Sequence, residues 1–321
     1  MVQRLRNLDV KRWWDVLLVV TFVPGAASVA LVFFIYPIGI GSHANIYTDA
    51  AAAWLGGGNP WLVGPPSAVF AGPPSMLLPF VPFVGLPVDV TRLAWFFGDL
   101  LLSVWVLRRL SMPTYWLAFP PLFSAIVLGH IELVVLAAIV LGGAVSGLAV
   151  VIKPYAALPL LAERRWSALV VAALALAVTF PVLPWVQFFE QSGVIAATLA
   201  RQDVGDSVFG QPLPMLIVGL ALLALGPRRA LWLAVPVLWP YAQPIYKSLS
   251  IPVLAPVVAF FWALPFEGAT LAGVVALAAL VVVSRVRALP AFLAAGIAPV
   301  ATWAQSSPES VAKPATQLAA V

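Results

Sequence analysis

The chain has 321 residues, of which 63% are hydrophobic and only 9% are charged, and its mean hydropathy is +1.04. A water-soluble domain of this size cannot bury so much apolar surface, so we expect lipid to be the solvent for most of the chain. The net charge of +5 comes from short Lys and Arg clusters between apolar segments, which is typical of cytoplasmic loops and argues against a nucleic-acid partner. Cysteine is absent, which excludes disulfides, and two distant histidines do not indicate a zinc site.

The N-terminal segment predicts the first membrane-spanning helix. "MVQRLRNLDVKRWW" is basic and precedes an apolar run, as in a signal peptide, and "SVA" at 28–30 resembles a cleavage site. The apolar run nevertheless continues through "LVFFIYPIGI" to Ile40, which is too long for a cleaved signal peptide. We therefore expect an uncleaved helix from Trp14 to Ile40 with its basic end in the cytoplasm.

Residues 41–90 are predicted to form one long segment on the outer side of the membrane. Positive-inside reasoning places the next basic pair, Arg108 and Arg109, in the cytoplasm, so the chain must cross back before it. The apolar stretch 75–88 is short and holds three prolines, which remove helix hydrogen bonds that lipid cannot replace. We place that stretch at the outer interface and expect residues 91–107 to cross inward.

The apolar segments that follow are shorter. The predicted crossings are 113–128, 131–142, 144–152, 155–162, 166–186, 213–226, 230–242, 249–265 and 270–284. Several fall below the ~20 residues of a full span, and Gly-Gly and Lys-Pro pairs break them. Such breaks are tolerated in lipid only where protein or a water-filled cavity covers the backbone. Residues 187–212 are a second outer loop, and 243–248 form a third outer turn.

These segments together predict an all-α polytopic membrane protein with about 10–12 transmembrane helices. Residues 1–305 form a single domain, and the polar tail at 306–321 is expected to be disordered. Strict alternation would place "RVR" at 285–287 on the outer side, so one of the last two segments is expected not to cross.

The candidate functional residues are polar side chains at membrane depth or on the outer side, because a charged group at a helix centre costs about 2.5–3.5 kcal/mol to insert. The predicted topology brings nearly all of them to the outer side, with Asp99 as the mid-helix exception. They are His43 and Asp49 in the first loop, Arg92 near its end, His130 and Glu132 at a turn, Lys153 at the Lys-Pro break, Asp203 and Asp206 in the second loop, and Gln243, Tyr246 and Lys247 in the third turn. One carboxylate-bearing loop and two lysines therefore reach the same face of the membrane.

Structural explanations compete with functional ones at each position. Lys247 could extend its amine to the interface, and His130 with Glu132 could cap a tight turn. Asp49 precedes "AAAA" and could be the N-cap of a helix lying along the membrane, a role compatible with catalysis. Lys153 is different, because a buried lysine before a proline needs an anion or a carbonyl partner.

Four stretches, in this order, resemble a known family: "IYTDAAAAWLGGGNPW", "FAGPPSMLLPFVPF", "GHIELVVLAAIVLG" and "GLAVVIKPYAALPLLAERRW". They are similar to motifs of the polyprenol-phosphate-mannose-dependent mannosyltransferases of the GT-C glycosyltransferase superfamily. The resemblance spans residues 40–170, and the Lys-Pro block is its most specific part. The family's catalytic Asp lies four residues before the tyrosine, where this chain has His43; Asp49 follows Tyr47 by two residues instead.

The resemblance implies a membrane enzyme with its active site on the outer face of the cell membrane and its N-terminus in the cytoplasm. It would transfer mannose, with inversion, from a polyprenyl-phosphate donor to a lipid or glycan acceptor of the cell envelope. Asp49 would be the base and His43 an orienting group, since a carboxylate also stabilises an oxocarbenium-like centre. Lys153 and Lys247 would hold the donor phosphate, and the remaining substrate contacts would come from His130, Glu132, Gln243 and Tyr246. A leaving phosphate monoester needs no metal, and we expect no cofactor.

Two other readings stay open on the sequence alone. A transporter or flippase would use the same outer polar groups to bind an anionic lipid headgroup without chemistry. A catalytically degenerate relative of the glycosyltransferases would keep the fold and serve as a structural subunit.

Overall fold

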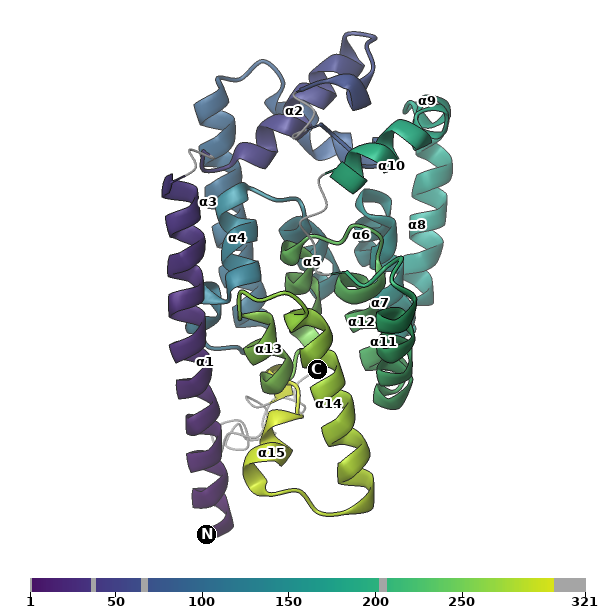
Figure 1. Cartoon of the computed structure of the whole chain (residues 1–321). Helices are drawn as coiled ribbons and strands as arrows, with labels where there is room; N and C mark the ends of the chain where they lie inside the picture. The colour runs from purple at the N-terminus through teal and green to yellow at the C-terminus, as the bar shows by residue number, and fades with distance from the viewer. Residues whose placement is uncertain (1, 36–38, 65–68, 202–206, 303–321) are drawn as a thin grey trace, which may run out of the picture.

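The computed structural model describes residues 2–35, 39–64, 69–201 and 207–302, and it contains no strand within these ranges (Figure 1). The predicted all-α class is confirmed. The α-helices are α1 (Val2–Ile35), α2 (Ser42–Leu55), α3 (Val88–Arg109), α4 (Pro120–Leu128), α5 (Glu132–Leu141), α6 (Leu148–Ile152), α7 (Ala157–Ala162), α8 (Trp166–Thr179), α9 (Trp185–Glu190), α10 (Ser192–Arg201), α11 (Pro212–Leu225), α12 (Pro227–Leu238), α13 (Pro256–Trp262), α14 (Ala269–Val286) and α15 (Ala291–Gly296). The 3-10 helices are η1 (Pro60–Leu62), η2 (Pro74–Phe83), η3 (Thr114–Ala118), η4 (Ala144–Gly147), η5 (Pro154–Ala156), η6 (Pro244–Val253) and η7 (Val300–Thr302).

Three of the described helices are long and apolar enough to cross a membrane: Asp9–Ile35 within α1, α3 and α14. The 22 residues of α3 extend about 33 Å at 1.5 Å per residue, which matches a hydrocarbon core of about 30 Å. Helices α4 and α5 would form a fourth span if they act as one, but they meet at a bend of 113°. The prediction of more crossings therefore depends on helices that are each too short to span alone.

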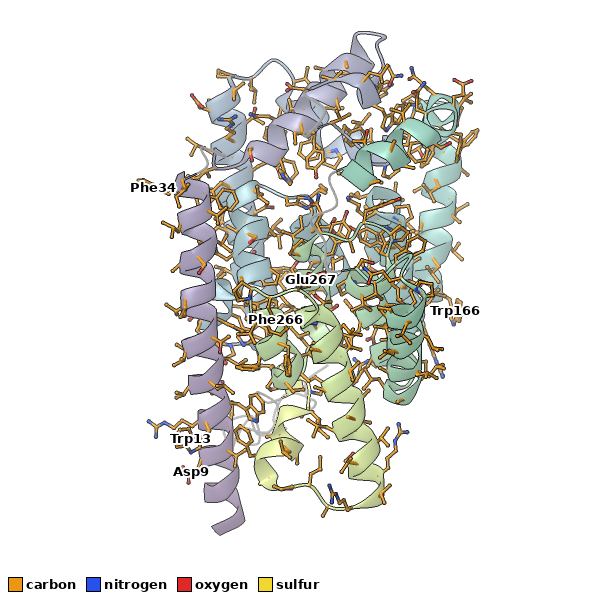
Figure 2. The ribbon with its side chains drawn as sticks, viewed as in Figure 1. Asp9, Trp13, Phe34, Trp166, Phe266 and Glu267 are labelled. Carbon is orange, nitrogen blue, oxygen red and sulfur yellow. The ribbon has the colours of Figure 1, made fainter. Side chains whose placement is uncertain are left out.

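Large apolar side chains cover the outside of the bundle, where a soluble protein would carry polar groups. Phe34 is 86% exposed and Trp166 is 63% exposed, and both point away from the ribbon on opposite sides of Figure 2. Val178 on α8 and Leu223 on α11 are also largely exposed. Such a surface is stable only when lipid tails cover it, so the composition and the fold agree on a membrane protein.

A separate layer of helices lies across one end of the bundle, at the top of Figure 1. We call this layer the α2 layer; it comprises α2, η2, α9 and α10. The end of the bundle that it covers is the α2 end. The layer has its own apolar core, formed by residues such as Tyr47, Trp61, Phe80 and Trp95. The 3-10 helix η2 corresponds to the proline-containing stretch 75–88, and it lies in this layer as an interfacial segment would.

Helix α2 is held at this end by close backbone contacts. Gly41 precedes it with φ +69°, and its N–H donates to the carbonyl of Val127 on α4 (2.8 Å). A Cβ at Gly41 would lie 2.5 Å from the carbonyl oxygen of Arg92, so only glycine fits. The small residues Ala44, Ala50 and Ala51 are fully buried, which lets α2 pack closely on its neighbours. The predicted outer segment 41–90 therefore begins with a well-packed helix, α2.

The breaks expected in the short helices occur where the sequence places them. Gly142 and Gly143 end α5 with φ values of +82° and +61°, which other residues rarely adopt. Lys153 separates α6 from η5 in an extended conformation (φ −138°, ψ 108°), as expected for a residue before proline. This break leaves the lysine side chain inside the bundle.

Several sequence-based boundaries need correction. Helix α1 ends at Ile35, five residues before the predicted end, and Asp49 lies inside α2, so it is not an N-cap. The part of the predicted second outer loop up to Arg201 is largely helical, because it contains α10 and most of α9. The predicted tail at 306–321 lies outside the described residues.

The basic loops gather away from the α2 end. Arg228 Nε donates to Glu163 Oε1 (2.8 Å), which joins the "ERR" and "PRR" loops. Arg285 Nη2 donates to the carbonyl of Ala224 (2.7 Å), next to the "PRR" loop, so "RVR" lies with the other basic loops. The segments between α12 and α14, namely η6 and the seven-residue α13, are short, as expected if one predicted crossing fails.

Candidate active site

Four segments far apart in sequence bring their polar side chains together between the bundle and the α2 layer. We call this group the Lys153 cluster; it comprises His43 and Tyr47 from α2, His130 and Glu132 from the α4–α5 turn, Lys153 and Tyr155 from the α6–η5 break, and Tyr246 from η6. The cluster lies between the two apolar cores, which exclude water from its sides.

Lys153 and Glu132 form a charged pair in the cluster, with Nζ and Oε1 3.4 Å apart. The glutamate side chain is fully buried, and the lysine side chain is 10% exposed. Tyr155 donates a hydrogen bond from its hydroxyl to the same carboxylate oxygen. Lys153 Nζ also donates to the hydroxyl of Tyr246 (3.4 Å) and lies 5.4 Å from the centre of that ring. A buried charge requires such partners, so the pair satisfies both groups.

The hydrogen bonds of His130 define its tautomer. The backbone N–H of Glu132 donates to His130 Nδ1 (3.3 Å), so this nitrogen is the acceptor and Nε2 carries the proton. Nε2 then donates to the hydroxyl of Tyr47 (3.2 Å). Because the oxygen of Tyr47 accepts this bond, its own proton remains able to donate to a bound molecule.

His43 lies next to His130, with ring centres 5.0 Å apart. Desolvation by burial lowers the pKa of His43 to about 4, and the positive charge of Lys153 acts in the same direction. The imidazole is therefore neutral at physiological pH and can accept a proton. An anion bound beside Lys153 would offset that charge and make the imidazole a stronger base.

Asp49 lies on the opposite side of α2. It follows Tyr47 by two residues, which is about 200° around a helix of 3.6 residues per turn, and its side chain is exposed. Partial desolvation raises the pKa of this carboxyl. In this conformation Asp49 is thus separated from the Lys153 cluster, whereas His43, four residues before Tyr47, faces it.

The other predicted residues have different positions. Lys247 is buried in η6 beside Tyr246 in the chain, and Gln243 precedes η6 at its N-cap. Asp99 is buried on α3, near the backbone of His130. Asp203 and Asp206 lie outside the described residues.

Sequence reasoning missed two members of the cluster, Tyr47 and Tyr155. A tyrosine in an apolar helix is usually a packing residue, so neither one is conspicuous. The quoted motifs do hold both: Tyr47 is in "IYTDAAAA" and Tyr155 is in "IKPYAALP".

The cluster combines one lysine paired with one carboxylate, two neutral imidazoles and several hydroxyl groups. A lysine next to hydroxyl donors is suited to a phosphate oxygen, and neutral histidines can accept protons. No group of three or more His, Asp and Glu residues in the described ranges is arranged to hold a metal ion. The arrangement fits the binding of an anion together with a proton transfer.

These features define the class as a helical membrane protein with a buried Lys–Glu pair between the bundle and the α2 layer. The model for glycosyltransferase family 87 matches residues 70–239, which is more than half of the chain. The chain therefore belongs to glycosyltransferase family 87 and is a glycosyltransferase. Searches of curated proteins and of solved structures find no match.

The matched range divides the cluster. It includes His130, Glu132, Lys153 and Tyr155, and it begins after α2 and ends before η6. The buried charge pair thus belongs to the family-matched part, while His43, Tyr47 and Tyr246 come from the flanking segments.

Proposed function

We propose that the protein transfers mannose from a polyprenyl-phosphate donor to a lipid or glycan acceptor, and that the Lys153 cluster holds the donor phosphate. The observation that supports this most is the position of Lys153, a buried cation on the family-matched segment. An ammonium group has three N–H donors, and the described contacts of Lys153 Nζ use two, to Glu132 and Tyr246. The third can bind a phosphate oxygen without breaking the existing pair.

The reaction is a single displacement at the anomeric carbon. The acceptor hydroxyl oxygen forms a bond to that carbon, the carbon–oxygen bond to the phosphate breaks, and its electron pair leaves on the phosphate oxygen. One displacement inverts the anomeric configuration. Lys153 stabilises the charge that develops on the leaving phosphate, which is the role of preorganised cations in a water-poor site.

For the acceptor proton we propose His43 as the base in place of Asp49. The support is geometric, because His43 faces the cluster while the carboxylate of Asp49 is exposed on the far side of α2. Binding of the anionic donor would raise the basicity of His43 when it is needed. The hydroxyl of Tyr47 is placed to donate to a sugar hydroxyl. Lys247 remains a proposed contact of the donor phosphate, and Gln243 and Tyr246 remain proposed substrate contacts.

We further propose that the α2 end faces the outside of a cell membrane and that the N-terminus is cytoplasmic. The basic loops at the other end support this orientation. Single cysteines at Asn59 and Ser207 should react with an impermeant thiol reagent in intact cells, and one at Arg164 should not. Labelling of the Arg164 position alone would reverse the orientation.

Transfer itself is tested with the purified protein in lipid nanodiscs, radiolabelled polyprenyl-phosphate sugars and lipid or glycan acceptors. The proposal predicts a mannosylated product with inverted configuration. Tight donor binding without product, for every sugar and acceptor tried, would favour the transporter or the degenerate relative.

A further inference from the structure

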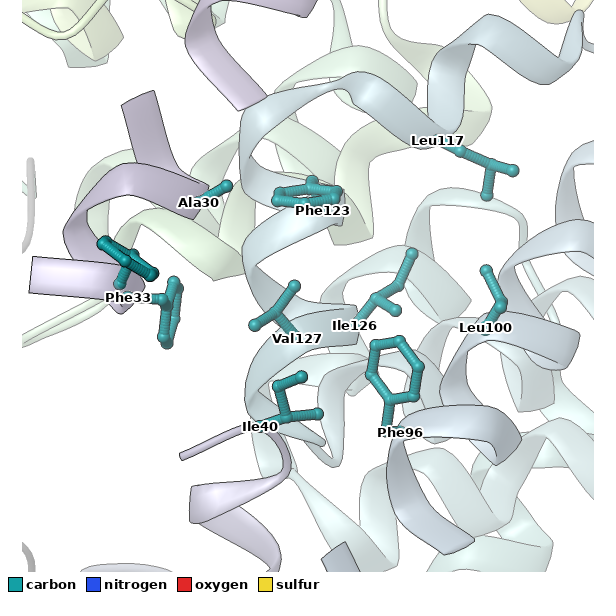
Figure 3. A pocket seen from close by; sticks show the side chains of 10 residues that line it. Ala30, Phe33, Ile40, Phe96, Leu100, Leu117, Phe123, Ile126 and Val127 are labelled. Atoms are coloured by element: carbon teal, nitrogen blue, oxygen red, sulfur yellow. The ribbon is translucent and has the colours of Figure 1, made fainter. Parts of the chain in front are cut away.

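An apolar groove of about 520 Å³ lies between α1, α3 and α4, and Figure 3 shows the side chains that line it. Its lining comes from Ala30, Phe33 and Phe34 on α1, Ile40 after it, Phe96 and Leu100 on α3, Leu117 on η3, and Phe123, Ile126 and Val127 on α4. Every one of these side chains is hydrocarbon. The volume falls within the ~300–1,000 Å³ of small-ligand sites.

The groove and the Lys153 cluster share a wall. Val127 lines the groove, and its carbonyl accepts the N–H of Gly41, which follows the groove residue Ile40. His43 follows Gly41 by two residues, and His130 follows Val127 by three. The imidazoles of these two histidines are paired in the cluster. A molecule that fills the groove therefore has its end next to the cluster.

A cation lies at this end of the groove. Arg92 is one turn before the groove residue Phe96 on α3, so both are on the same face of that helix. In the amide orientation that satisfies its hydrogen bonding, the side-chain oxygen of Asn45 accepts hydrogen bonds from Arg92 Nε (2.6 Å) and Nη2 (2.7 Å). Arg92 Nη1 lies close to Gly39: a Cβ added at Gly39 would be 2.8 Å from this nitrogen. Among the described residues no carboxylate is within salt-bridge distance of Arg92.

We propose that this groove binds the prenyl chain of the donor, with the chain entering from the bilayer and Arg92 attracting the phosphate as it passes to Lys153. The inference rests on the proposed function, and it assigns the residues that recognise the lipid part of the substrate. Continuity with the cluster and the charge of Arg92 favour a single-chain lipid phosphate. An ordinary phospholipid is the alternative occupant.

Binding can be measured without any sugar transfer. Wild-type protein in nanodiscs is irradiated with decaprenyl phosphate that carries a diazirine in its prenyl chain, and the labelled peptides are identified by mass spectrometry. Leu100→Trp fills the groove, and Leu101→Trp is the matched control because Leu101 is 69% exposed on the lipid side of the same helix. Phosphatidylglycerol and unphosphorylated decaprenol serve as competitors.

The expected label lies in residues 96–100 and 117–127. Leu100→Trp should reduce it about tenfold or more, while Leu101→Trp leaves it unchanged. Arg92→Gln should weaken competition by unlabelled decaprenyl phosphate but not by decaprenol. Labelling elsewhere, equal effects of the two tryptophan variants, or equal competition by phosphatidylglycerol would overturn the inference.

A kinetic comparison separates this inference from the proposed function. If the wild type transfers sugar, Leu100→Trp should raise KM for a decaprenyl donor and leave KM for a geranyl donor close to wild type. Transfer with identical kinetics in Leu100→Trp and Leu101→Trp would refute the groove while keeping the proposed function. Groove labelling by a wild type that transfers no sugar would keep the groove and refute the transferase proposal.

Discussion

Lys153 has two roles in this account, as the partner of a buried carboxylate and as the ligand of the donor phosphate, and one set of variants separates them. Lys153→Met leaves the buried carboxyl of Glu132 without its counter-charge, and Tyr155 is then the hydrogen-bond donor that remains to it. Removing one partner of a buried ion pair costs about 3–5 kcal/mol, so this variant should unfold at a much lower temperature. Glu132→Gln removes the charge that needs compensation while its amide oxygen can still accept from Tyr155. The double variant Lys153→Met with Glu132→Gln should therefore recover most of the lost stability.

Donor binding should follow a different order in the same proteins. Loss of a charge-assisted hydrogen bond to the phosphate costs about 1.5–3 kcal/mol, or roughly 10- to 150-fold in Kd. Both variants that lack Lys153 should show this loss, including the restabilised double variant. Glu132→Gln alone should bind the donor at least as tightly as wild type, because the lysine no longer shares its charge with a carboxylate. The assays are thermal unfolding in nanodiscs and equilibrium binding of a radiolabelled polyprenyl phosphate. Wild-type affinity in the double variant would show that Lys153 is structural only.

Three further predictions concern α2 and its packing. His43→Ala should lower kcat by about 10²–10⁴-fold while Asp49→Asn stays within a few-fold of wild type, and the reverse order in a transfer assay would make Asp49 the base. Burial and the charge of Lys153 lower the pKa of His43 to about 4, so this imidazole stays neutral as the pH falls towards 5. The value of kcat/KM should therefore be flat between about pH 8 and 5. A fall in kcat/KM below about pH 6.5 would contradict the buried site. Gly41→Ala should lower the unfolding temperature more than Gly57→Ala. Both glycines have a positive φ, which costs another residue about 1–2 kcal/mol, but only at Gly41 would the added Cβ meet a backbone oxygen. Equal effects of the two substitutions would refute the close contact between Gly41 and α3.

Much of the site could be predicted from the sequence because polar groups in an apolar chain are few. Their assignment to one membrane face already grouped Lys153 with His130, Glu132 and Tyr246, and the Lys-Pro pair predicted the break that turns the lysine inward. The role of Glu132 as the counter-charge of Lys153 did not follow, since the two lie 21 positions apart in the sequence and the packing of α5 against α6 brings them together.

The rotation of α2 was the main feature that the sequence could not provide. Spacing alone shows that His43 and Asp49 face different directions, but not which of them faces the bundle. That choice depends on the burial of Ala44, Ala50 and Ala51 and on the backbone contact between Gly41 and α4. Helix length was also misleading, because the first apolar run continues past the end of α1 at Ile35.

The most direct test of the central claim is a cryo-EM map of the protein bound to a phosphonate analogue of a polyprenyl-phosphate mannose, which cannot release its sugar. The account predicts phosphonate density within hydrogen-bond distance, about 2.7–3.2 Å, of Lys153 Nζ, with the sugar next to His43 and Tyr47. Phosphonate density remote from Lys153, or a sugar bound at the exposed face of α2 beside Asp49, would contradict it.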